Sequence, residues 1–312
     1  MKIGIDVMGG DFAPDAIVLG AIEAHKELSD DIRLVLIGDE EKINPILERE
    51  NYAASNFDIV HTSEYIRMDE HPTKAFKQKP NSSIAIGFGM LKKGLIDGFA
   101  SAGSTGAMLV GSMYTVKSIP GIIRPAIAGF FPVGMDQYNL VLDVGLNPDC
   151  RPDVLYQYGI LGSLYAEHVF GIKNPKVGLV NIGSEEEKGN IISQTTHELM
   201  KDNTDFNFVG NVEGNEVFTE KANVLVCDGF VGNVMLKQAE AFYKLALSRN
   251  IDDAYFNRFN FEKVGGTPVL GINSTVIIGH GISNATAIKN MILQTREVIN
   301  AKLSQKIKEA FN

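Results

Sequence analysis

Residues 2–28 read KIGIDVMGGDFAPDAIVLGAIEAHKEL and contain the pattern that decides the fold. The apolar run Lys2–Val7 predicts a β-strand, and the glycine pair at positions 9 and 10 predicts a tight turn. From Ile17 to Leu28 the apolar residues recur with the 3.6-residue period of a helix. Pro14 suits the first turn of that helix, where its missing N–H costs nothing. The stretch therefore predicts a strand, a turn and a helix in succession.

The same succession recurs along the chain. Apolar runs stand at 34–37, 57–61, 99–102, 140–144, 177–182, 224–227 and 275–278. Most lead through a glycine-containing turn into a helix, the final helix running to about Ala310, whereas the run at 57–61 leads into a loop over 68–80. Alternating strands and helices predict a mainly parallel sheet covered on both faces, a three-layer Rossmann-like α/β fold. With no long linker, we expect one catalytic domain over 1–312, with a small helical lobe at about 235–265.

Composition and charge exclude several classes of protein. The formal net charge of −9 over 312 residues argues against a nucleic-acid partner. The cysteines, Cys150 and Cys227, form no C-x-x-C motif, which argues against a disulfide framework or a structural zinc site. The most apolar stretch, 119–135, contains three prolines and a charged residue and is too short to span a bilayer. The first residues, MKIGIDVMGGD, carry a charge at Asp6 and have no apolar core of signal-peptide length. We expect a cytoplasmic protein.

Glycine is enriched, and the turns that follow the strands indicate where a ligand binds. The chain has 31 glycines, about 10% of its residues against a usual value of about 7%. Ligands of open α/β sheets bind at the carboxyl ends of the strands, where free N–H groups of the following helices favour an anion. The dinucleotide fingerprint, the P-loop, H-E-x-x-H and G-x-S-x-G are all absent, and the histidines are scattered. A standard NTPase, hydrolase or metal enzyme is therefore disfavoured.

Seven turn motifs together resemble one family. They are DVMGGD (6–11), SAGSTGA (101–107), LDVGLN (142–147), NIGSEEEKGN (181–190), GNVEG (210–214), CDGFVGN (227–233) and GGTPVLG (265–271). In this order they resemble the phosphate acyltransferase family of bacterial phospholipid synthesis, from Lys2 to about Arg296. The resemblance implies an isocitrate/isopropylmalate dehydrogenase-like fold. It also implies transfer of a long-chain acyl group from acyl-acyl-carrier-protein to inorganic phosphate, without a metal or organic cofactor.

The resemblance further implies partners. It predicts a homodimer that acts peripherally at the cytoplasmic face of the membrane, with a glycerol-3-phosphate acyltransferase downstream. Because acyl carrier proteins are acidic, docking needs a local basic surface. The candidates are Lys74, Lys77 and Lys79, or Lys92 and Lys93, although each is also explained as ordinary surface charge. The phenylalanines at 256, 259 and 261 form either a membrane-touching or dimer-contacting tip, or part of the core.

Three residues are the candidate catalytic residues. Lys188 follows three glutamates; alone, this pattern reads as a solvated helix start, whereas its match to the family motif favours contact with phosphate. Asn233 is either a first-turn residue or an amide donor to the thioester oxyanion or to phosphate, and the resemblance favours the second role. Asp228 is its orienting partner. Direct attack by phosphate requires no protein nucleophile, which agrees with the absence of a Ser-His or Cys-His motif.

The candidate substrate-binding residues lie in the same turns and nearby loops. They are Gly103, Ser104, Thr105, Asn147, Asp143, Lys79, Ser82, Arg124, Asn181 and His280. Capping or bracing is the alternative for the hydroxyls and for Asp143. The family usually has Asn at position 104 and Ala at position 146, where this chain has Ser104 and Leu146. Arg124 is equally an ion-pair partner, and His280 is more often a structural histidine than a general acid.

Other functions stay open from the sequence. One is a short-chain phosphate acetyltransferase that uses acetyl-CoA. Another is a nicotinamide-dependent dehydrogenase on the related fold, and a third is a non-catalytic scaffold that binds the acyl carrier. Acyl phosphate formation from acetyl-CoA compared with a long-chain carrier thioester tests the first alternative. Reduced-cofactor absorbance tests the dehydrogenase, and carrier binding without turnover would indicate the scaffold.

Overall fold

The computed structural model describes residues 1–311, and the chain folds into two compact units. Unit 1 comprises residues 1–118 and 261–304, and unit 2 comprises residues 119–260 and the segment that begins at Gln305. Each unit has its own strands and helices. That both act as a single catalytic domain, with a small helical lobe over about 235–265, stays a prediction.

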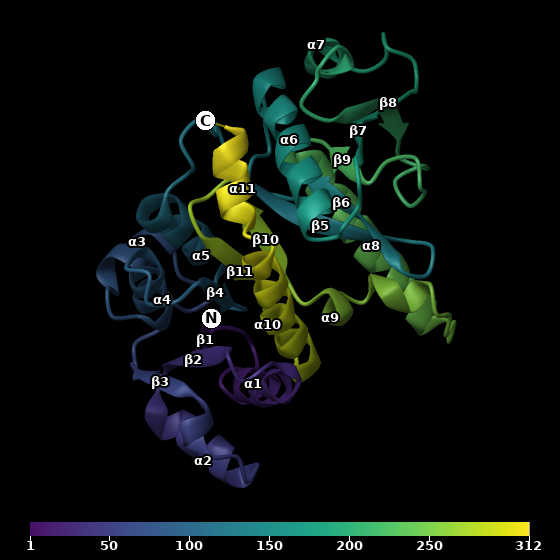
Figure 1. Ribbon diagram of the computed structural model, residues 1–312. Coiled ribbons are helices and arrows are strands. Elements are labelled where there is room, and N and C mark those ends of the chain that lie inside the picture. Colours follow the sequence, from purple (N-terminus) through teal and green to yellow (C-terminus); the bar gives the residue numbers. More distant parts are fainter. Residues whose placement is uncertain (312) are drawn as a thin grey trace. The chain divides into compact units, whose positions relative to one another are not determined.

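Unit 1 is built on a mostly parallel sheet (Figure 1). Its strand order is β3 (Asp58–His61), β2 (Arg33–Gly38), β1 (Lys2–Asp6), β4 (Gly98–Ser101), β11 (Thr275–Ile278) and β10 (Thr267–Leu270). The pair β10–β11 is antiparallel, and the other pairs are parallel. Strands β1, β2, β4 and β11 are almost entirely buried, as expected for a parallel sheet covered on both faces.

Helices cover both faces of this sheet. They are α1 (Asp15–Glu27), α2 (Glu40–Arg49), η1 (Ala54–Asn56), α3 (Pro72–Gln78), α4 (Ser83–Lys92), α5 (Thr105–Gly111), η2 (Ser112–Val116), α9 (Phe261–Val264), α10 (Ala285–Asn300) and the start of α11 (Leu303–Ala310). Two successive residues of β4 show the two faces. Gly98 faces Thr295 and Ile299 of α10, whereas the ring of Phe99 packs against Phe88 of α4. The unit therefore has the predicted three layers.

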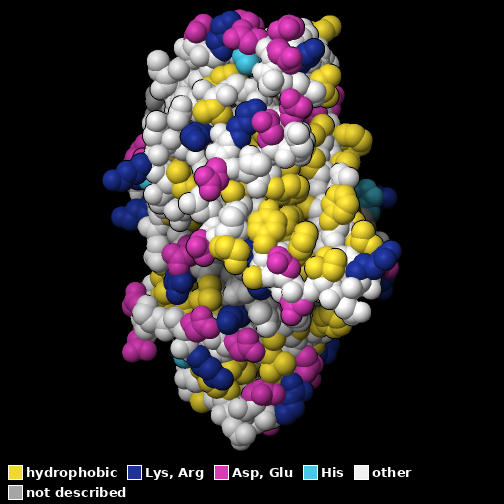
Figure 2. Space-filling model, turned by 90° about the vertical axis from the view of Figure 1, so that its right-hand side faces the viewer, with side chains coloured by type: hydrophobic (Ala, Val, Ile, Leu, Met, Phe, Trp, Pro, Cys, Tyr) yellow, Lys and Arg dark blue, Asp and Glu magenta, His cyan; other side chains and the backbone are white. Residues whose placement is uncertain are grey.

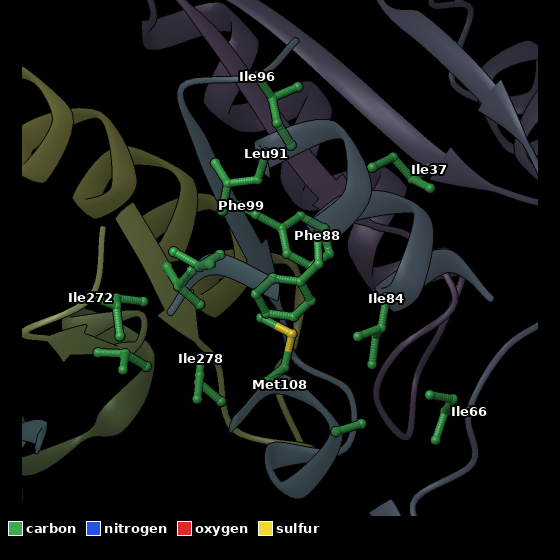
Figure 3. Close-up of a cluster of buried hydrophobic side chains, with 14 of the residues drawn as sticks. Ile37, Ile66, Ile84, Phe88, Leu91, Ile96, Phe99, Met108, Ile272 and Ile278 are labelled. Atoms are coloured by element: carbon green, nitrogen blue, oxygen red, sulfur yellow. The ribbon is translucent and has the colours of Figure 1, made fainter. Parts of the chain in front are cut away.

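Aromatic and aliphatic side chains form the core between α4, α5 and the sheet (Figure 3). The rings of Phe88 and Phe99 are both fully buried and meet edge to face, with centroids 5.2 Å apart. Ile37 from β2, Met108 from α5 and Ile278 from β11 belong to the same cluster. Burying one such side chain contributes about 1.5–3 kcal/mol. This core fixes the strands whose carboxyl ends bear the unit's turns.

The strands of unit 2 run in mixed directions. Its strand order is β5 (Ala126–Val133), β6 (Gln137–Leu142), β9 (Val224–Val226), β7 (Lys176–Asn181) and β8 (Asn207–Glu213). Strands β5 and β6 form an antiparallel hairpin, and the remaining pairs are parallel. Its helices are α6 (Pro152–His168), α7 (Ile191–Lys201), α8 (Gly229–Ser248), η3 (Phe256–Phe259) and the rest of α11. Helix α6 packs closely on β6 and β9, where Gly162 lies against Leu142 and Val224.

The structure departs from the sequence predictions in some elements. The predicted loop over 68–80 contains helix α3, whose start at Pro72 is compatible with a first helical turn. The predicted single C-terminal helix is two helices, because Lys302 between them has φ of 50°. Strands β5, β8 and β10 were not predicted, since each leads into another strand and not into a helix. The motifs at 210–214 and 265–271, read as turns in the sequence, lie largely in β8 and β10. No helix within residues 1–311 has both the length and the apolar character needed to cross a bilayer.

Candidate active site

Three predicted turns meet at one edge of the unit 2 sheet. Strands β6, β9 and β7 are adjacent and parallel, with Leu142 and Leu179 each in register with Val226. Their carboxyl ends therefore lie at the same edge, followed by residues 143–147, 227–233 and 182–190. The arrangement is the one in which α/β sheets bind their ligands.

Asp143 is the centre of the first of these turns. Its Oδ1 accepts a hydrogen bond from the N–H of Ile127 (2.9 Å), and its Oδ2 accepts from the N–H of Leu146 (3.1 Å) and of Asn147 (2.6 Å). Burial raises the pKa of Asp143, while these backbone hydrogen bonds oppose the rise. Because its oxygens are buried and occupied, Asp143 braces the turn, the alternative that the sequence left open.

Asn147 connects this turn to two helices. Its Nδ2 donates to the carbonyl oxygen of Pro125 (2.7 Å) and to the hydroxyl of Tyr158 in α6 (2.8 Å). Its own carbonyl oxygen accepts from the N–H of Gly229 at the start of α8 (2.7 Å). Sequence reasoning missed Tyr158, because a tyrosine among the apolar residues of α6 looks like any core residue. Asn147 therefore holds the first turn of α8 in place.

Asn233 and Asp228 both belong to this end of α8. Asp228 is the N-cap, and its Oδ1 accepts from the N–H of Val231 (2.8 Å). The Nδ2 of Asn233 donates to the carbonyl oxygen of Val144 (3.4 Å) and lies against Gly145, where an added Cβ would be 2.9 Å from that nitrogen. Within residues 1–311, the second N–H of this amide has no protein partner. Asn233 is half-buried and is therefore available to a ligand.

The turn over 182–190 carries Lys188. Asn181 closes it, since its Oδ1 accepts from the N–H of Ile182 (2.8 Å) and its Nδ2 donates to the carbonyl oxygen of Lys188 (3.1 Å). Gly189 has φ of 92°, and an added Cβ would lie 2.4 Å from Asn181 Oδ1. Lys188 is exposed, and its ammonium group contacts no carboxylate or carbonyl among residues 1–311. Asn181 therefore shapes the turn, and the Lys188 side chain is free.

Sequence reasoning also missed two buried side chains that contact this turn, Asn211 and His197. The Nδ2 of Asn211 in β8 donates to the carbonyl oxygen of Glu185 (2.8 Å), and Oδ1 of the same side chain contacts His197 of α7 (3.1 Å). The sequence around His197 and Asn211 carries no motif, and the face of α7 that buries His197 also holds Thr196 and Met200 and not the isoleucines of the helix, so nothing marked either residue.

Arg124 lies in unit 2, outside the turns. Its Nη1 donates to the carbonyl oxygen of Asp149 (2.8 Å), and the side chain is exposed. No carboxylate pairs with it among the residues that the structure describes. The sequence left two roles open for Arg124, an ion pair or a contact with an anion, and the structure shows no ion pair among the described residues.

A second group of predicted residues lies at the carboxyl edge of the unit 1 sheet, where β1, β4 and β11 are adjacent and parallel. The Ser101 hydroxyl donates to Oδ2 of the buried Asp6 (2.6 Å) and accepts from the N–H of Gly103 (2.9 Å). Ser104 is the buried N-cap of α5, with its Oγ 3.4 Å from the N–H of Ala107. The neighbouring Thr105 is exposed. Burial is the main cause that raises the pKa of Asp6.

Lys79, Ser82 and His280 also belong to unit 1. The Lys79 ammonium pairs with Glu70 (2.6 Å), and the Ser82 hydroxyl donates to the Lys79 carbonyl oxygen (2.8 Å) while it caps α4. The His280 ring lies 5.0 Å from the ring of Phe261. Its Nδ1 accepts from the N–H of Ile282 (3.4 Å). All three side chains therefore have structural contacts, and their roles toward substrate stay predictions.

The described residues contain no group of three or more histidine, cysteine or acidic side chains arranged to hold a metal ion. Both cysteines are buried, and burial raises the pKa of Cys150 to about 11 and the pKa of Cys227 well above its usual value. A thiol with a raised pKa is a poor nucleophile at neutral pH. Neither cysteine therefore qualifies as a nucleophile, whereas the Lys188 amine and the Asn233 amide have polar hydrogens free to meet a ligand.

The fold and these turns define an α/β protein with its candidate site at the carboxyl edges of parallel strands. Residues 1–306 match the family model described as "Fatty acid synthesis protein". The chain is 42% identical to the phosphate acyltransferase of Dictyoglomus turgidum, over 100% of this chain and 98% of that protein. It is also 42% identical to the phosphate acyltransferase of Desulforamulus reducens, over 99% and 97% of the two chains. The chain belongs to the phosphate acyltransferase family.

Solved structures with little sequence identity share the fold. A phosphotransacetylase from Streptococcus pyogenes matches with a TM-score of 0.67 and 18% identity, over 96% of this chain and 94% of that chain. The EutD phosphotransacetylase from Staphylococcus aureus has a TM-score of 0.64 and 18% identity, over 95% and 94%. The 4-hydroxythreonine-4-phosphate dehydrogenase from Klebsiella pneumoniae has a TM-score of 0.55 and 12% identity, over 96% and 98%. The expected fold, common to phosphate acetyltransferases and dehydrogenases, is confirmed.

Proposed function

We propose that this protein transfers a long-chain acyl group from acyl-acyl-carrier-protein to inorganic phosphate. The observation that carries the proposal is the 42% identity, over the whole chain, to proteins named phosphate acyltransferase. That name gives the acceptor and the transferred group, and the acyl-carrier thioester is the donor that we propose. The match to a fatty acid synthesis family supports this choice of donor.

The reaction needs no group beyond the two substrates and the protein. An oxygen of hydrogen phosphate attacks the thioester carbonyl carbon, so that a C–O bond forms and the C–S bond breaks. The products are acyl phosphate and the carrier thiol, which takes up the proton that the phosphate loses. The protein contributes by positioning phosphate and by stabilising the negative charge that develops on the carbonyl oxygen.

Lys188 and Asn233 are the residues that we assign to these tasks. The free ammonium group of Lys188 binds phosphate, and the unpartnered amide N–H of Asn233 donates to the developing oxyanion. Removing one donor of this kind from an enzyme costs about 10²–10³-fold in turnover. Asp228 orients Asn233 by capping α8, and Asp143, Asn147 and Asn181 support the turns from behind.

The remaining predicted residues keep a proposed role in substrate binding. In unit 1 these are Gly103, Ser104, Thr105, Lys79, Ser82 and His280, and in unit 2 this is Arg124. We propose no metal or organic cofactor. The carrier docks on exposed lysines, for which Lys74, Lys77, Lys92 and Lys93 qualify and the paired Lys79 is the weakest candidate.

The test is phosphate-dependent formation of acyl phosphate, trapped with hydroxylamine, from acyl-carrier thioester and purified protein. Lys188→Ala and Asn233→Asp should each lower turnover by about 10²-fold or more, because each removes a donor at nearly constant fold. Lys173→Ala, at another exposed lysine of unit 2, is the control and should keep wild-type turnover. Wild-type rates in both site variants would show that the assigned residues are wrong.

The donor is tested in the same assay. Acetyl-CoA at the same concentration as the long-chain carrier thioester should give much slower acyl phosphate formation. Faster turnover of acetyl-CoA would instead make the protein a short-chain phosphate acetyltransferase. If the protein binds the acyl carrier but phosphate does not release the carrier thiol, the protein is a carrier-binding scaffold. If neither donor yields acyl phosphate, the proposed function is wrong.

We also propose a cytoplasmic homodimer that touches the membrane peripherally and feeds a glycerol-3-phosphate acyltransferase. Helix α8 supports the dimer, because it exposes large hydrophobic side chains that a monomer would leave in water: Phe230, Val234, Phe242, Leu245 and Leu247. Figure 2 views the side on which α8 lies in Figure 1 and shows hydrophobic side chains gathered there. Light scattering should give twice the chain mass, and Phe242→Glu should lower it toward that of one chain.

A further inference from the structure

A buried polar pair lies behind the Lys188 turn. His197 in α7 and Asn211 in β8 are only 4% and 2% exposed, and His197 Nδ1 lies 3.1 Å from Asn211 Oδ1. The ring of Phe208 packs edge to face against His197 at 5.1 Å. Burying polar side chains costs free energy unless their hydrogen bonds are made, and apolar side chains pack such positions at no such cost. The contacts of the pair indicate what it does.

The hydrogen bonds of Asn211 fix the orientation of both side chains. Its Nδ2 donates to the carbonyl oxygen of Glu185 (2.8 Å), which can only accept, so Oδ1 faces His197 and His197 Nδ1 carries the proton. His197 Nε2 then faces Oε1 of Glu186 at 4.0 Å, and Glu186 also pairs with Lys201 (3.1 Å). At 4.0 Å the approach to Glu186 is too long for a hydrogen bond, so the pair is tied to the turn over 182–190 by the hydrogen bond from Asn211 to the Glu185 carbonyl.

The same turn determines where Lys188 stands. The N–H of Lys188 donates to the carbonyl oxygen of Glu185 (3.2 Å), the oxygen that Asn211 also binds. The carbonyl oxygen of Lys188 is held from the other side by Asn181 (3.1 Å). The Lys188 side chain has no protein partner of its own within residues 1–311. Its position is thus set by its backbone, and the backbone is held through Glu185.

We propose that His197 and Asn211 are positioning residues for Lys188, which they place through the carbonyl of Glu185. The inference rests on the proposed function, in which Lys188 binds phosphate. Neither side chain contacts substrate in this role. A misplacement of about 1 Å at a reacting group can cost about 10²-fold in rate, so loss of the pair should be visible in turnover.

The first test compares three variants in the acyl phosphate assay. Asn211→Leu keeps the size of the side chain but removes both hydrogen bonds, and it should lower kcat/KM for phosphate by about 10–100-fold while KM for the carrier thioester stays unchanged. His197→Asn keeps an N–H donor near the position of Nδ1 and should stay close to wild type, whereas His197→Phe should resemble Asn211→Leu. Equal loss in His197→Asn and His197→Phe, or an unchanged kcat/KM in Asn211→Leu, would overturn the inference.

The second test asks whether the pair acts through Lys188. In a Lys188→Ala background, Asn211→Leu should cause no further loss of turnover, because residues that act as a unit are not additive. A further loss as large as in the wild-type background would mean that the pair supports the fold generally. Thr195→Ala, an exposed position of α7, is the matched control and should change neither background.

The third test does not depend on the function. Hydrogen exchange should accelerate in peptides over residues 182–190 of Asn211→Leu and stay unchanged in the unit 1 sheet, which verifies that the variant is folded. Unchanged exchange over 182–190 would overturn the inference even if activity falls. If wild-type protein forms no acyl phosphate, the proposed function and the catalytic part of this inference fail together, and the exchange result alone decides whether the pair holds the turn.

Discussion

The capping role of Asp228 predicts a specific pattern among three variants. Its Oδ1 accepts from the N–H of Val231 at 2.8 Å, at the start of the helix that carries Asn233. Asp228→Ala leaves this N–H without its partner, and loss of an N-cap typically costs about 1 kcal/mol, within a range of 0.5–2. Asp228→Ser and Asp228→Asn keep an oxygen that caps a helix equally well, so both should unfold close to wild type.

The expected size of the change is within the reach of urea unfolding. With a slope of about 3 kcal/mol per molar urea, 1 kcal/mol moves the midpoint of the unit 2 transition by about 0.3 M. Because the chain has two units, the transition is followed by a probe confined to unit 2, such as hydrogen exchange of α8, as well as by circular dichroism.

Turnover measured on the same proteins separates capping from chemistry. If Asp228 acts by orienting Asn233, Asp228→Ala should lose both stability and turnover, and Asp228→Ser should recover both. A serine variant that regains stability but stays as inactive as the alanine variant would refute the reasoning, since the carboxylate itself would then act on substrate. If Asp228→Ala is as stable as wild type, Asp228 does not stabilise α8 as its N-cap.

Three further predictions concern other parts of the molecule. Gly145→Ala should lower acyl phosphate formation at least tenfold and cost about 1–2 kcal/mol in urea unfolding, because φ is 115° there and a Cβ would displace the Asn233 amide; wild-type turnover would contradict this. Burial raises the pKa of Asp6, so this group stabilises the fold below about pH 4 and loses that contribution as the pH rises through the raised pKa. Urea unfolding followed from about pH 4 upward should therefore show the stability of Asp6→Asn rising relative to that of wild type, and a pH-independent difference would speak against it. Phe88→Ala should lower the free energy of unfolding by about 3–5 kcal/mol, since the ring is fully buried against Phe99. A loss under about 1 kcal/mol would mean that neighbouring side chains move in to fill the cavity.

Much of the candidate site could be predicted from the sequence because its signals are local. The turns at 143–147, 182–190 and 227–233 each follow an apolar run, and the structure places all three at one sheet edge. For Asp143, predicted to bind substrate with bracing of the turn as the alternative, the hydrogen bonds favour bracing. It did not reveal that the Lys79 ammonium is occupied by Glu70, since nothing in the intervening loop predicted helix α3 or the contact.

The sequence by itself determined the alternation of strands and helices and the positions of the glycine turns, because side-chain period and glycine content are properties of neighbouring residues. Only the tertiary structure decided which polar groups are used up and which are free. The side-chain amide of Asn147 is hydrogen-bonded to Tyr158 and Pro125, whereas the ammonium group of Lys188 has no protein partner within residues 1–311. Such contacts join residues of different elements, and they depend on the fold that brings those elements together.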